Sequence, residues 1–527
     1  MTPWTGRRVT SRVRARGWLR TESPLHVGGL GTGPAEPLPL AVDGLNRPYV
    51  PGTTLAGVLR DWSRGAGPDA LDELWGFAAA RGDGGRASRV IVADALVTSD
   101  RRLDERGLPA SPLSVAQLEV RSSVGIDRTT GAAAPEILYG RQVVPAGHYL
   151  RLEIDVESAE SPALDEARMR ALLTALAAGE IRLGAATGRG LGVVRLLDDC
   201  LDLVVDRFDS PAGLLAVLRD DATRARSLTS LGTADPELPP RRELLDIQIG
   251  WKPLAPVMVR ATASGLTVDT LPLTTRVDDR HLTLVLAGSS LKGALRGHAE
   301  FVERTARGIT APQAARGASA SEHSIAFRAQ LDQLRAVRAL FGAARDDVKD
   351  RRAGALRVEE CDSLVTIPES LWLSATGADA ALAAPDEREG SLPRAVRERL
   401  DDHGLAQADH VALDRWTGGA ADGRLFSVLE PHSVRWEPIR LSIDLTRLGD
   451  ERDHALALLL LTLRDLAAGR VPVGAAVNRG FGDIEVSGIT LSGGPWHEQI
   501  ELADVLNGPE ISTIARAWTD YLAQEVS

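Results

Sequence analysis

The chain has 527 residues, of which 44% are hydrophobic and 25% charged, a composition typical of a soluble globular protein with two or three domains. Its most apolar stretch, residues 455–463, is too short to cross a bilayer, and the arginines near the N-terminus lead into no apolar run, so no signal peptide is expected. Both cysteines lack the spacing of a zinc site and are typical of reduced thiols, which predicts a cytoplasmic protein.

The net charge of −11 argues only weakly against a nucleic-acid binder, because such a binder needs a local positive face and not a positive total. Among 61 cationic side chains only Lys252, Lys292 and Lys349 are lysines. Nearly every cation is therefore a guanidinium, the group that suits bidentate phosphate contacts.

Strand-like and helix-like periodicities alternate along the chain. In chain order we expect a helix at 53–62, a strand at 149–156, a helix at 169–178, a linker with a short helix at 219–226, a helix at 289–302, a strand at 439–445, a helix at 454–468, and amphipathic helices at 496–506 and 509–526.

Two motifs occur twice in the same order. The pattern Gly-x-x-Leu-x-Gly-x-Leu-Arg at 52–60 returns at 288–296, and the glycine-rich segment 184–192 returns at 474–482. A repeat of this length predicts two fused copies of one α+β domain of the ferredoxin-like (RRM-like) type. We place the first domain at 1–200, the linker at 201–240, the second domain at 241–495 and a helical tail at 496–527. The second copy carries insertions after Arg296 and between Asp362 and Asp414, the latter expected to be a polar surface loop.

The first motif opens a helix after a strand, where backbone N–H groups favour an anion and a glycine permits close approach of a phosphate. A well-capped helix with solvated cations would explain the same residues. The second motif places an arginine in a glycine-rich turn between a helix and a strand, which suits a polyanion, although duplication would also preserve structural glycines. The candidate RNA-binding residues are Gly52, Thr53, Thr54, Arg60, Gly188, Arg189, Gly190, Gly288, Ser289, Ser290, Lys292, Arg296, Asn478, Arg479 and Gly480.

These motifs, together with Leu-Trp/Phe-Gly at 74–76 and 340–342 and Asp-Arg-x-Thr-Gly at 127–131 and 414–418, resemble the CRISPR-associated RAMP superfamily and its type III backbone subunits. The resemblance implies CRISPR RNA, target RNA and other type III effector subunits as partners, and no membrane. It also implies a β-hairpin thumb in each copy, at 124–144 around Asp127 and Arg128 and at 411–429 around Asp414 and Arg415. A plain hairpin turn would explain the Asp-Arg motif equally well.

Family members that cut target RNA use an aspartate in the loop before the first motif, so the resemblance implies a metal-dependent endoribonuclease with Asp269 as the catalytic and metal-binding carboxylate and Mg²⁺ as the divalent metal. Aligning the shared Leu-Pro-Leu places Glu36 opposite Asp269 in the first copy, and Asp43 competes with Glu36. Each acid could instead be a solvated loop carboxylate. The alternatives are a non-catalytic structural subunit, a stand-alone CRISPR RNA-processing enzyme that uses His26 as a general base, and an interaction protein without RNA.

Overall fold

The computed structural model describes the chain except residues 1–7, 32–36, 68–70, 79–84, 127–132, 220–222, 226–227, 229–230, 262–264, 266, 311–318, 320–321, 323–324, 326–328, 344–351, 378–391 and 525–527. It divides into two compact units. Unit 1 comprises Met1–Arg121, Tyr139–Thr187 and Leu191–Arg242, and unit 2 comprises Ser122–Leu138, Gly188–Gly190 and Glu243–Ser527. Each unit has its own hydrophobic core.

Unit 1 is built on an antiparallel sheet whose principal strands run in the order β9–β1–β7–β3. Along β7, alternate side chains from Leu150 to Val156 are buried, which is the period-2 pattern that predicted this strand. The elements are β1 (Ser11–Thr21), β2 (Tyr49–Val50), α1 (Gly52–Arg64), α2 (Asp72–Trp75), β3 (Val90–Val92), β4 (Ala95–Thr98), β7 (Tyr149–Ser158), α3 (Pro162–Ala178), β8 (Val194–Leu196), β9 (Asp202–Arg207), α4 (Pro211–Leu218) and β10 (Thr223–Ala225).

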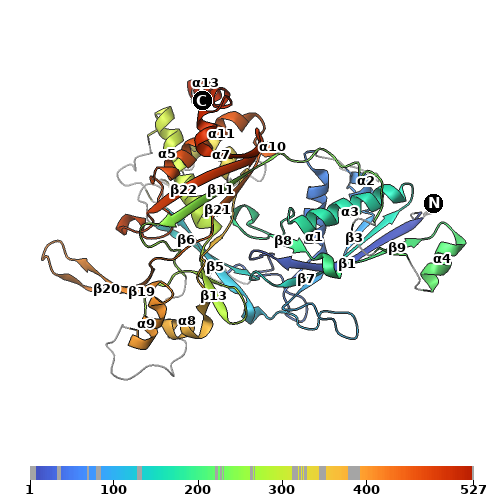
Figure 1. Cartoon of the computed structure of the whole chain (residues 1–527), viewed down its shortest axis with the longest axis horizontal. Helices are drawn as coiled ribbons and strands as arrows, with labels where there is room; N and C mark the ends of the chain where they lie inside the picture. The colour runs from blue at the N-terminus through green and yellow to red at the C-terminus, as the bar shows by residue number, and fades with distance from the viewer. Residues whose placement is uncertain are drawn as a thin grey trace. The chain divides into compact units, whose positions relative to one another are not determined.

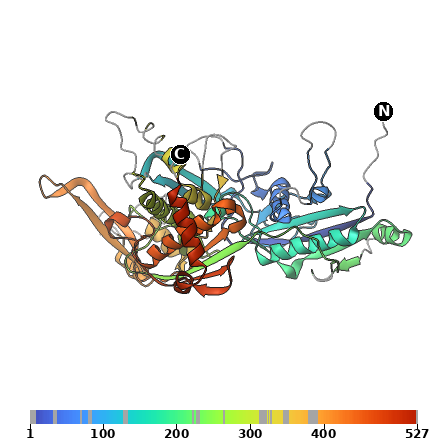
Figure 2. The same ribbon diagram turned by 90° about the horizontal axis from the view of Figure 1, so that it is seen from above.

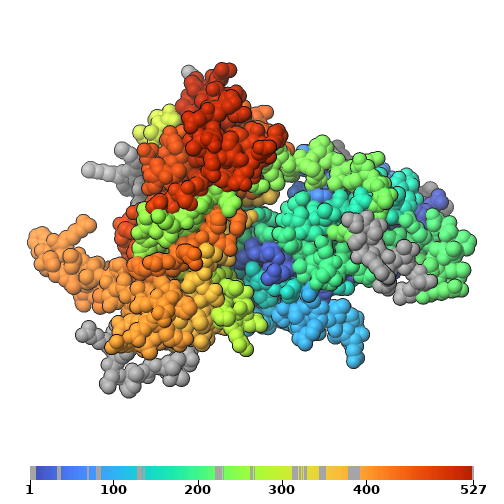
Figure 3. Space-filling view, viewed as in Figure 1, coloured from blue at the N-terminus to red at the C-terminus, as the bar shows by residue number. Residues whose placement is uncertain are grey.

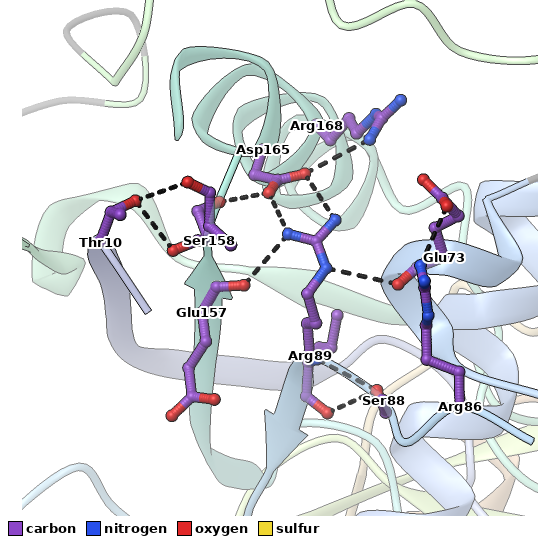
Figure 4. A network of polar contacts seen from close by, with 11 residues as sticks. Thr10, Glu73, Arg86, Ser88, Arg89, Glu157, Ser158, Asp165 and Arg168 are labelled. Atoms are coloured by element: carbon purple, nitrogen blue, oxygen red, sulfur yellow. Dashed lines mark hydrogen bonds and ion pairs between the residues drawn. The ribbon is translucent and has the colours of Figure 1, made fainter. Parts of the chain in front are cut away.

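A buried ionic network fixes α3 to this sheet (Figure 4). Asp165, which is 1% exposed, accepts hydrogen bonds from Arg89 at 2.5 Å, from Arg168 at 3.3 Å and from the Ser158 hydroxyl. Arg89 also donates to the backbone oxygen of Glu157, so one guanidinium ties β3 to both β7 and α3. Removing one member of such a buried pair costs about 3–5 kcal/mol, because the other charge is left unpaired.

Unit 2 has a five-stranded sheet in the order β16–β21–β11–β22–β23, and α5, α7 and α11 lie on one face of it (Figure 1). Its elements are β11 (Leu244–Pro253), β12 (Thr274–Arg276), β13 (His281–Leu286), α5 (Gly288–Arg307), α7 (Arg335–Phe341), β14 (Gly342–Ala343), β15 (Arg352–Ala353), β16 (Leu356–Val358), β17 (Cys361–Asp362), β18 (Ile367–Pro368), α8 (Glu369–Thr376), α9 (Arg394–Asp401), β21 (Ile439–Asp444), α10 (Leu445–Leu448), α11 (Arg452–Ala467), β22 (Ile484–Gly493), β23 (Trp496–Glu501), α12 (Leu502–Asn507) and α13 (Ile511–Ala523).

The two units share one topology. In unit 1, β1, β3, β7 and β9 occupy positions one to four of the motif, and β11, β16, β21 and β22 do so in unit 2. Both sheets then read in the spatial order 2-3-1-4, with α1 or α5 between the first two strands and α3 or α11 between the last two. This is the ferredoxin-like β-α-β-β-α-β arrangement, so the prediction of two tandem α+β domains is confirmed. Figure 2 shows α3 lying along the sheet of unit 1.

A hairpin is inserted at the same point of both copies. It is formed by β5 (Glu119–Ile126) and β6 (Ala133–Val143) in the first copy and by β19 (Leu405–Leu413) and β20 (Ala420–Pro431) in the second. Figure 3 shows the β19–β20 hairpin, in orange, projecting from unit 2. Hairpins were expected here, although each first strand begins several residues earlier than predicted.

Three sequence expectations need correction. The segment expected to be a linker at 201–240 contributes β9 to the first sheet, because residues 203–205 supply buried apolar side chains beside β1. The helix in this segment is α4, and not the predicted helix at 219–226. The tail begins with a strand, since β23 pairs with β22, and only α12 and α13 are helical. The insertion expected to be a polar loop contains α8 and α9, which bury Trp372 and Leu400; residues 378–391 lie outside the described part.

Candidate nucleic-acid interface

The glycine-rich turns have the same backbone geometry in both copies. Gly190 and Gly480 have φ of 93° and 89°, and Gly192 and Gly482 have φ of 86° and 89°. These values lie in the left-handed region that side chains with a Cβ rarely adopt, so the turn itself requires glycine there. Arg189 and Arg479 precede the first of these glycines and are both exposed. The repeated turn thus presents one guanidinium per copy at its surface.

In unit 2 this arginine belongs to a stack of aromatic groups. The Arg479 guanidinium lies 5.5 Å from the centroid of the Phe426 ring, and Phe426 stacks on His410 with centroids 5.3 Å apart and an interplanar angle of 14°. Phe481, two residues after Arg479, lies beside the imidazole of His410, with ring centroids 6.4 Å apart and ring planes tilted by 58°. The stack connects the glycine–arginine turn to the base of the β19–β20 hairpin.

The same residues line a cavity of about 370 Å³ in unit 2. Two guanidinium groups, Arg260 and Arg479, and the amide of Asn478 face it together with His410 and Thr270. A hollow with cations, an amide and an aromatic wall is suited to a phosphorylated ligand. Of the predicted residues, Asn478 and Arg479 are therefore brought together, in the company of groups that the sequence did not single out.

The helix-opening glycines have a different role. The Gly52 N–H donates to Asp94 Oδ1 at 2.7 Å, so a carboxylate of the chain already occupies this helix N-terminus. A methyl group on Gly52 would lie 2.3 Å from Val92 O, and one on Gly288 would lie 2.5 Å from Val358 O. Close packing of helix on strand accounts for both glycines. The hydroxyl residues that follow, Thr53 and Thr54 in α1 and Ser289 and Ser290 in α5, are exposed or half-buried on the first helical turn.

The cations that follow these glycines are engaged within the protein. Arg60 donates to Asp72 at 2.7 Å and Arg296 to Glu300 at 2.8 Å. Lys292 Nζ donates to Leu356 O at 2.6 Å, and burial, aided by neighbouring guanidinium groups, lowers the pKa of Lys292 to about 8. This motif therefore has the contacts of a capped, packed helix, and the glycine–arginine turns are the better candidates for RNA contact.

Asp269 lies at the base of the second hairpin and is exposed. Its Oδ2 accepts hydrogen bonds from the Ser427 N–H at 2.8 Å and from the Ser427 hydroxyl at 3.3 Å. Ser427 lies between Phe426 and Val428 of β20, which line the cavity, so strand alternation directs it to the opposite side. Asp269 is accordingly absent from the described lining of the cavity, and the structure does not bring this carboxylate together with Arg479.

Backbone pairing corrects the alignment of the two acidic loops. Thr270 N donates to Ser427 O, and Leu429 N donates to Thr270 O. In the first copy Leu38 makes the same two bonds, to Gly140 O and from Gln142 N. Leu38 therefore corresponds to Thr270, and Pro37 stands where Asp269 stands. The Leu-Pro-Leu alignment was wrong by one residue, a slip that sequence similarity cannot detect in a short strand. Glu36 itself lies outside the described residues.

Asp43 and His26 have structural partners. Asp43 accepts hydrogen bonds from Leu45 N, Arg47 N and the Arg47 guanidinium. Burial raises the pKa of this carboxyl, but the hydrogen bonds from Arg47 and Leu45 and the charge of Arg47 together hold it below its usual value. His26 is 3% exposed, its Nδ1 lies 2.7 Å from Gln142 O, and burial lowers its pKa. Neither environment suits a group that must reach a substrate.

The hairpin motif forms a turn in the second copy. Asp414 Oδ1 accepts from Trp416 N at 2.7 Å and Thr417 N at 3.0 Å, and the bond from Thr417 leads the effects that lower the pKa of Asp414. Arg415 lies in this turn, and the next residue, Trp416, is 96% exposed. Asp127 and Arg128 of the first copy lie outside the described residues.

Sequence reasoning missed Arg260, His410, Phe426 and Glu430. Phe426, Val428 and Glu430 share one face of β20 by alternation, which a correct strand register would have shown. His410 and Phe426 become neighbours only through strand pairing. No motif marks them, since the first copy has Tyr139 and Val143 along the matching stretch of β6 and β5 contains no histidine.

Two tandem ferredoxin-like domains, each with an inserted hairpin and an exposed arginine in a glycine turn, form an architecture that is compatible with nucleic-acid binding. The family model described as the RAMP superfamily matches residues 18–195 and 254–485, which together form most of the chain, and the chain belongs to that superfamily. RAMP proteins are CRISPR-associated RNA-binding proteins that work in complexes. The comparison with curated proteins found no match. No helix in the described part of the chain is long and apolar enough to cross a membrane.

Proposed function

We propose that this chain is a backbone subunit of a type III CRISPR effector complex, in which its two RAMP domains bind successive segments of one CRISPR RNA. The observation that carries the proposal is the pair of glycine–arginine turns with matched φ angles and exposed arginines. Two equivalent cationic turns are what a protein needs to bind a repeating sugar–phosphate backbone twice without reading its sequence.

We further propose that the second copy cleaves complementary target RNA and that the first does not. Asp269 supports this assignment, because it is exposed at the hairpin base and Ser427 fixes one of its oxygens. Pro37, which has no acidic group, occupies the corresponding position in the first copy. The reaction is attack of a ribose 2′-oxygen on the adjacent phosphorus. The 2′-hydroxyl loses its proton to water, the bond from phosphorus to the 5′-oxygen breaks, and the 5′-oxygen takes up a proton from water, which leaves a 2′,3′-cyclic phosphate and a 5′-hydroxyl.

A divalent metal fits this site only if the protein and the RNA both supply its ligands. Within the described chain no group of three or more His, Cys, Asp or Glu side chains is placed to hold a metal. Mg²⁺ is commonly bound by one or two carboxylates with substrate phosphates and water, so Asp269 and the RNA would hold it together. When bound, the metal would stabilise charge on the phosphate. Asp269 would orient it and contribute a fixed negative charge.

The test is a map of cuts along a matched target RNA, made with the assembled complex. Wild-type complex should cut at positions served by the second copy of this chain, and Asp269→Asn should remove those cuts while CRISPR RNA remains bound. Asp279→Asn, at an exposed acid elsewhere in unit 2, is the matched control and should leave the map unchanged. An unchanged map for Asp269→Asn would favour the structural, non-catalytic subunit.

A further inference from the structure

A buried carboxylate bridges two imidazoles beside the cavity of unit 2. Glu430, whose side chain is 8% exposed, lies 2.7 Å from His410 Nε2 through one oxygen and 3.0 Å from His432 Nε2 through the other. His410 faces the cavity and is 35% exposed, whereas His432 is open to solvent. The RNA cleavage proposed above does not involve these three side chains.

The carboxylate fixes the protonation pattern of His410. An ionised carboxylate only accepts hydrogen bonds, so His410 must carry its proton on Nε2 to bond with Glu430. In the neutral ring Nδ1 is then an acceptor. Stacking on Phe426 holds the plane of the ring, so the acceptor has a fixed direction. An acceptor at Nδ1 would suit a ligand that donates a hydrogen bond to it.

The other walls of the cavity supply the complementary half of a ligand site. Arg260 and Arg479 offer guanidinium donors to a phosphate, and Asn478 adds an amide. A ribonucleotide can bring phosphate oxygens to the two arginines and a hydroxyl donor to the imidazole, because its 2′-hydroxyl is close to its phosphate. A deoxyribonucleotide has the phosphate but lacks the hydroxyl.

We infer that this cavity binds one ribonucleotide of the RNA strand and that His410, oriented by Glu430, accepts a hydrogen bond from its 2′-hydroxyl. The inference rests on the proposed RNA-binding function and deepens it, since it assigns RNA-over-DNA selection to one residue. It is specific to the second copy, because the position of Arg260 is held by Gly28 in the first copy and β5 offers no histidine.

The experiment measures the affinity of the full chain for two labelled single-stranded oligonucleotides of one sequence, one RNA and one DNA, at pH 8, where histidine is ordinarily neutral. Wild type should prefer RNA. His410→Phe keeps the stack on Phe426 but removes the acceptor, so RNA affinity should fall by about threefold to tenfold, the range for one hydrogen bond, while DNA affinity stays unchanged.

Further variants separate the roles. Glu430→Gln should reduce the preference too, since an amide can also donate and no longer fixes the proton on Nε2. Arg479→Gln should weaken RNA and DNA equally. His497→Phe, at an exposed histidine of β23, is the control and should change neither. Single 2′-deoxy substitutions along the RNA should locate the nucleotide concerned in wild type and lose their effect in His410→Phe.

Two results have different meanings. If wild type binds neither oligonucleotide, and no RNA is recovered with the assembled complex, the proposed function fails. If wild type binds RNA but His410→Phe, folded with an unchanged melting temperature, leaves the RNA-to-DNA ratio as it was, the assignment of His410 is wrong and the RNA-binding function stands.

Discussion

The helix-opening glycines offer a direct comparison of packing with phosphate binding. In α1, Gly52 lies against Val92 O, where a methyl group would be 2.3 Å away, whereas a methyl on Gly57 would meet no described atom within 4 Å. Both residues belong to the same helix and the same repeated motif. Gly52→Ala and Gly57→Ala therefore form a pair of equal changes in one helix, of which only the first meets packed backbone.

The expected effects have opposite signs. Gly57→Ala should stabilise unit 1 by about 0.5–1 kcal/mol, because alanine loses less conformational entropy in a helix. Gly52→Ala must move the helix start away from Val92, which costs about 1–3 kcal/mol of overpacking. The same movement weakens the 2.7 Å bond from Gly52 N–H to Asp94, worth about 1.5–3 kcal/mol for a charged acceptor. A destabilisation of about 2–5 kcal/mol follows.

The assay is urea unfolding of the full chain, with hydrogen exchange of peptides from α1 to assign the transition to unit 1. Gly288→Ala and Gly293→Ala repeat the comparison in unit 2, where the two methyl groups would lie 2.5 Å from Val358 O and clear of described atoms, respectively. The reasoning is refuted if Gly52→Ala and Gly57→Ala unfold at the same urea concentration and Gly52→Ala weakens RNA binding alone.

Three further outcomes are expected. Arg479→Gln should weaken RNA binding for all sequences and reduce the slope of log K against log salt by about 1, measured by titration at several salt concentrations; an unchanged slope would contradict a phosphate contact. Tyr521→Phe should destabilise unit 2 by about 1–3 kcal/mol in urea unfolding, because it removes the hydroxyl that donates to the buried carboxylate of Glu303. A smaller loss of stability would mean that apolar packing alone holds α13. A hydrogen bond from His454, opposed by burial and aided by Arg335, lowers the pKa of Glu451 from its ordinary 4.5 to about 2. The stability that this carboxylate contributes should therefore be present above pH 4.5 and be lost as the pH falls toward 2. Glu451→Gln should flatten that part of the stability–pH curve.

The fold could be predicted from the sequence because the same motifs occur in two copies. Alternating burial along β7 and the apolar period of α3 and α11 follow from local pattern, and two copies of each motif fixed their order. The linker was misjudged because β9 is short and its buried residues are recognised only beside β1. Pairing of this kind depends on the tertiary structure, which local periodicity does not contain.

Only part of the candidate site could be predicted from the sequence. Arg479 and Asn478 stand in a motif, so they were found. The contact of Asp269 with Ser427 depends on pairing between segments far apart in the sequence, and the alignment of Glu36 failed by one residue for the same reason. His410 and Glu430 lie in two strands of ordinary appearance, β19 and β20, and only the hairpin register places His410 beside Phe426 in the cavity wall that carries Arg479.

The central claim is that both glycine–arginine turns contact the backbone of one RNA. Photo-crosslinking of the assembled complex to its own RNA, followed by mass spectrometry of the peptides, tests it most directly. Nucleotides attached to peptides that contain Arg189 and to peptides that contain Arg479 are the predicted result. Recovery of RNA crosslinked to other parts of the chain, with neither of these peptides modified, would contradict the claim.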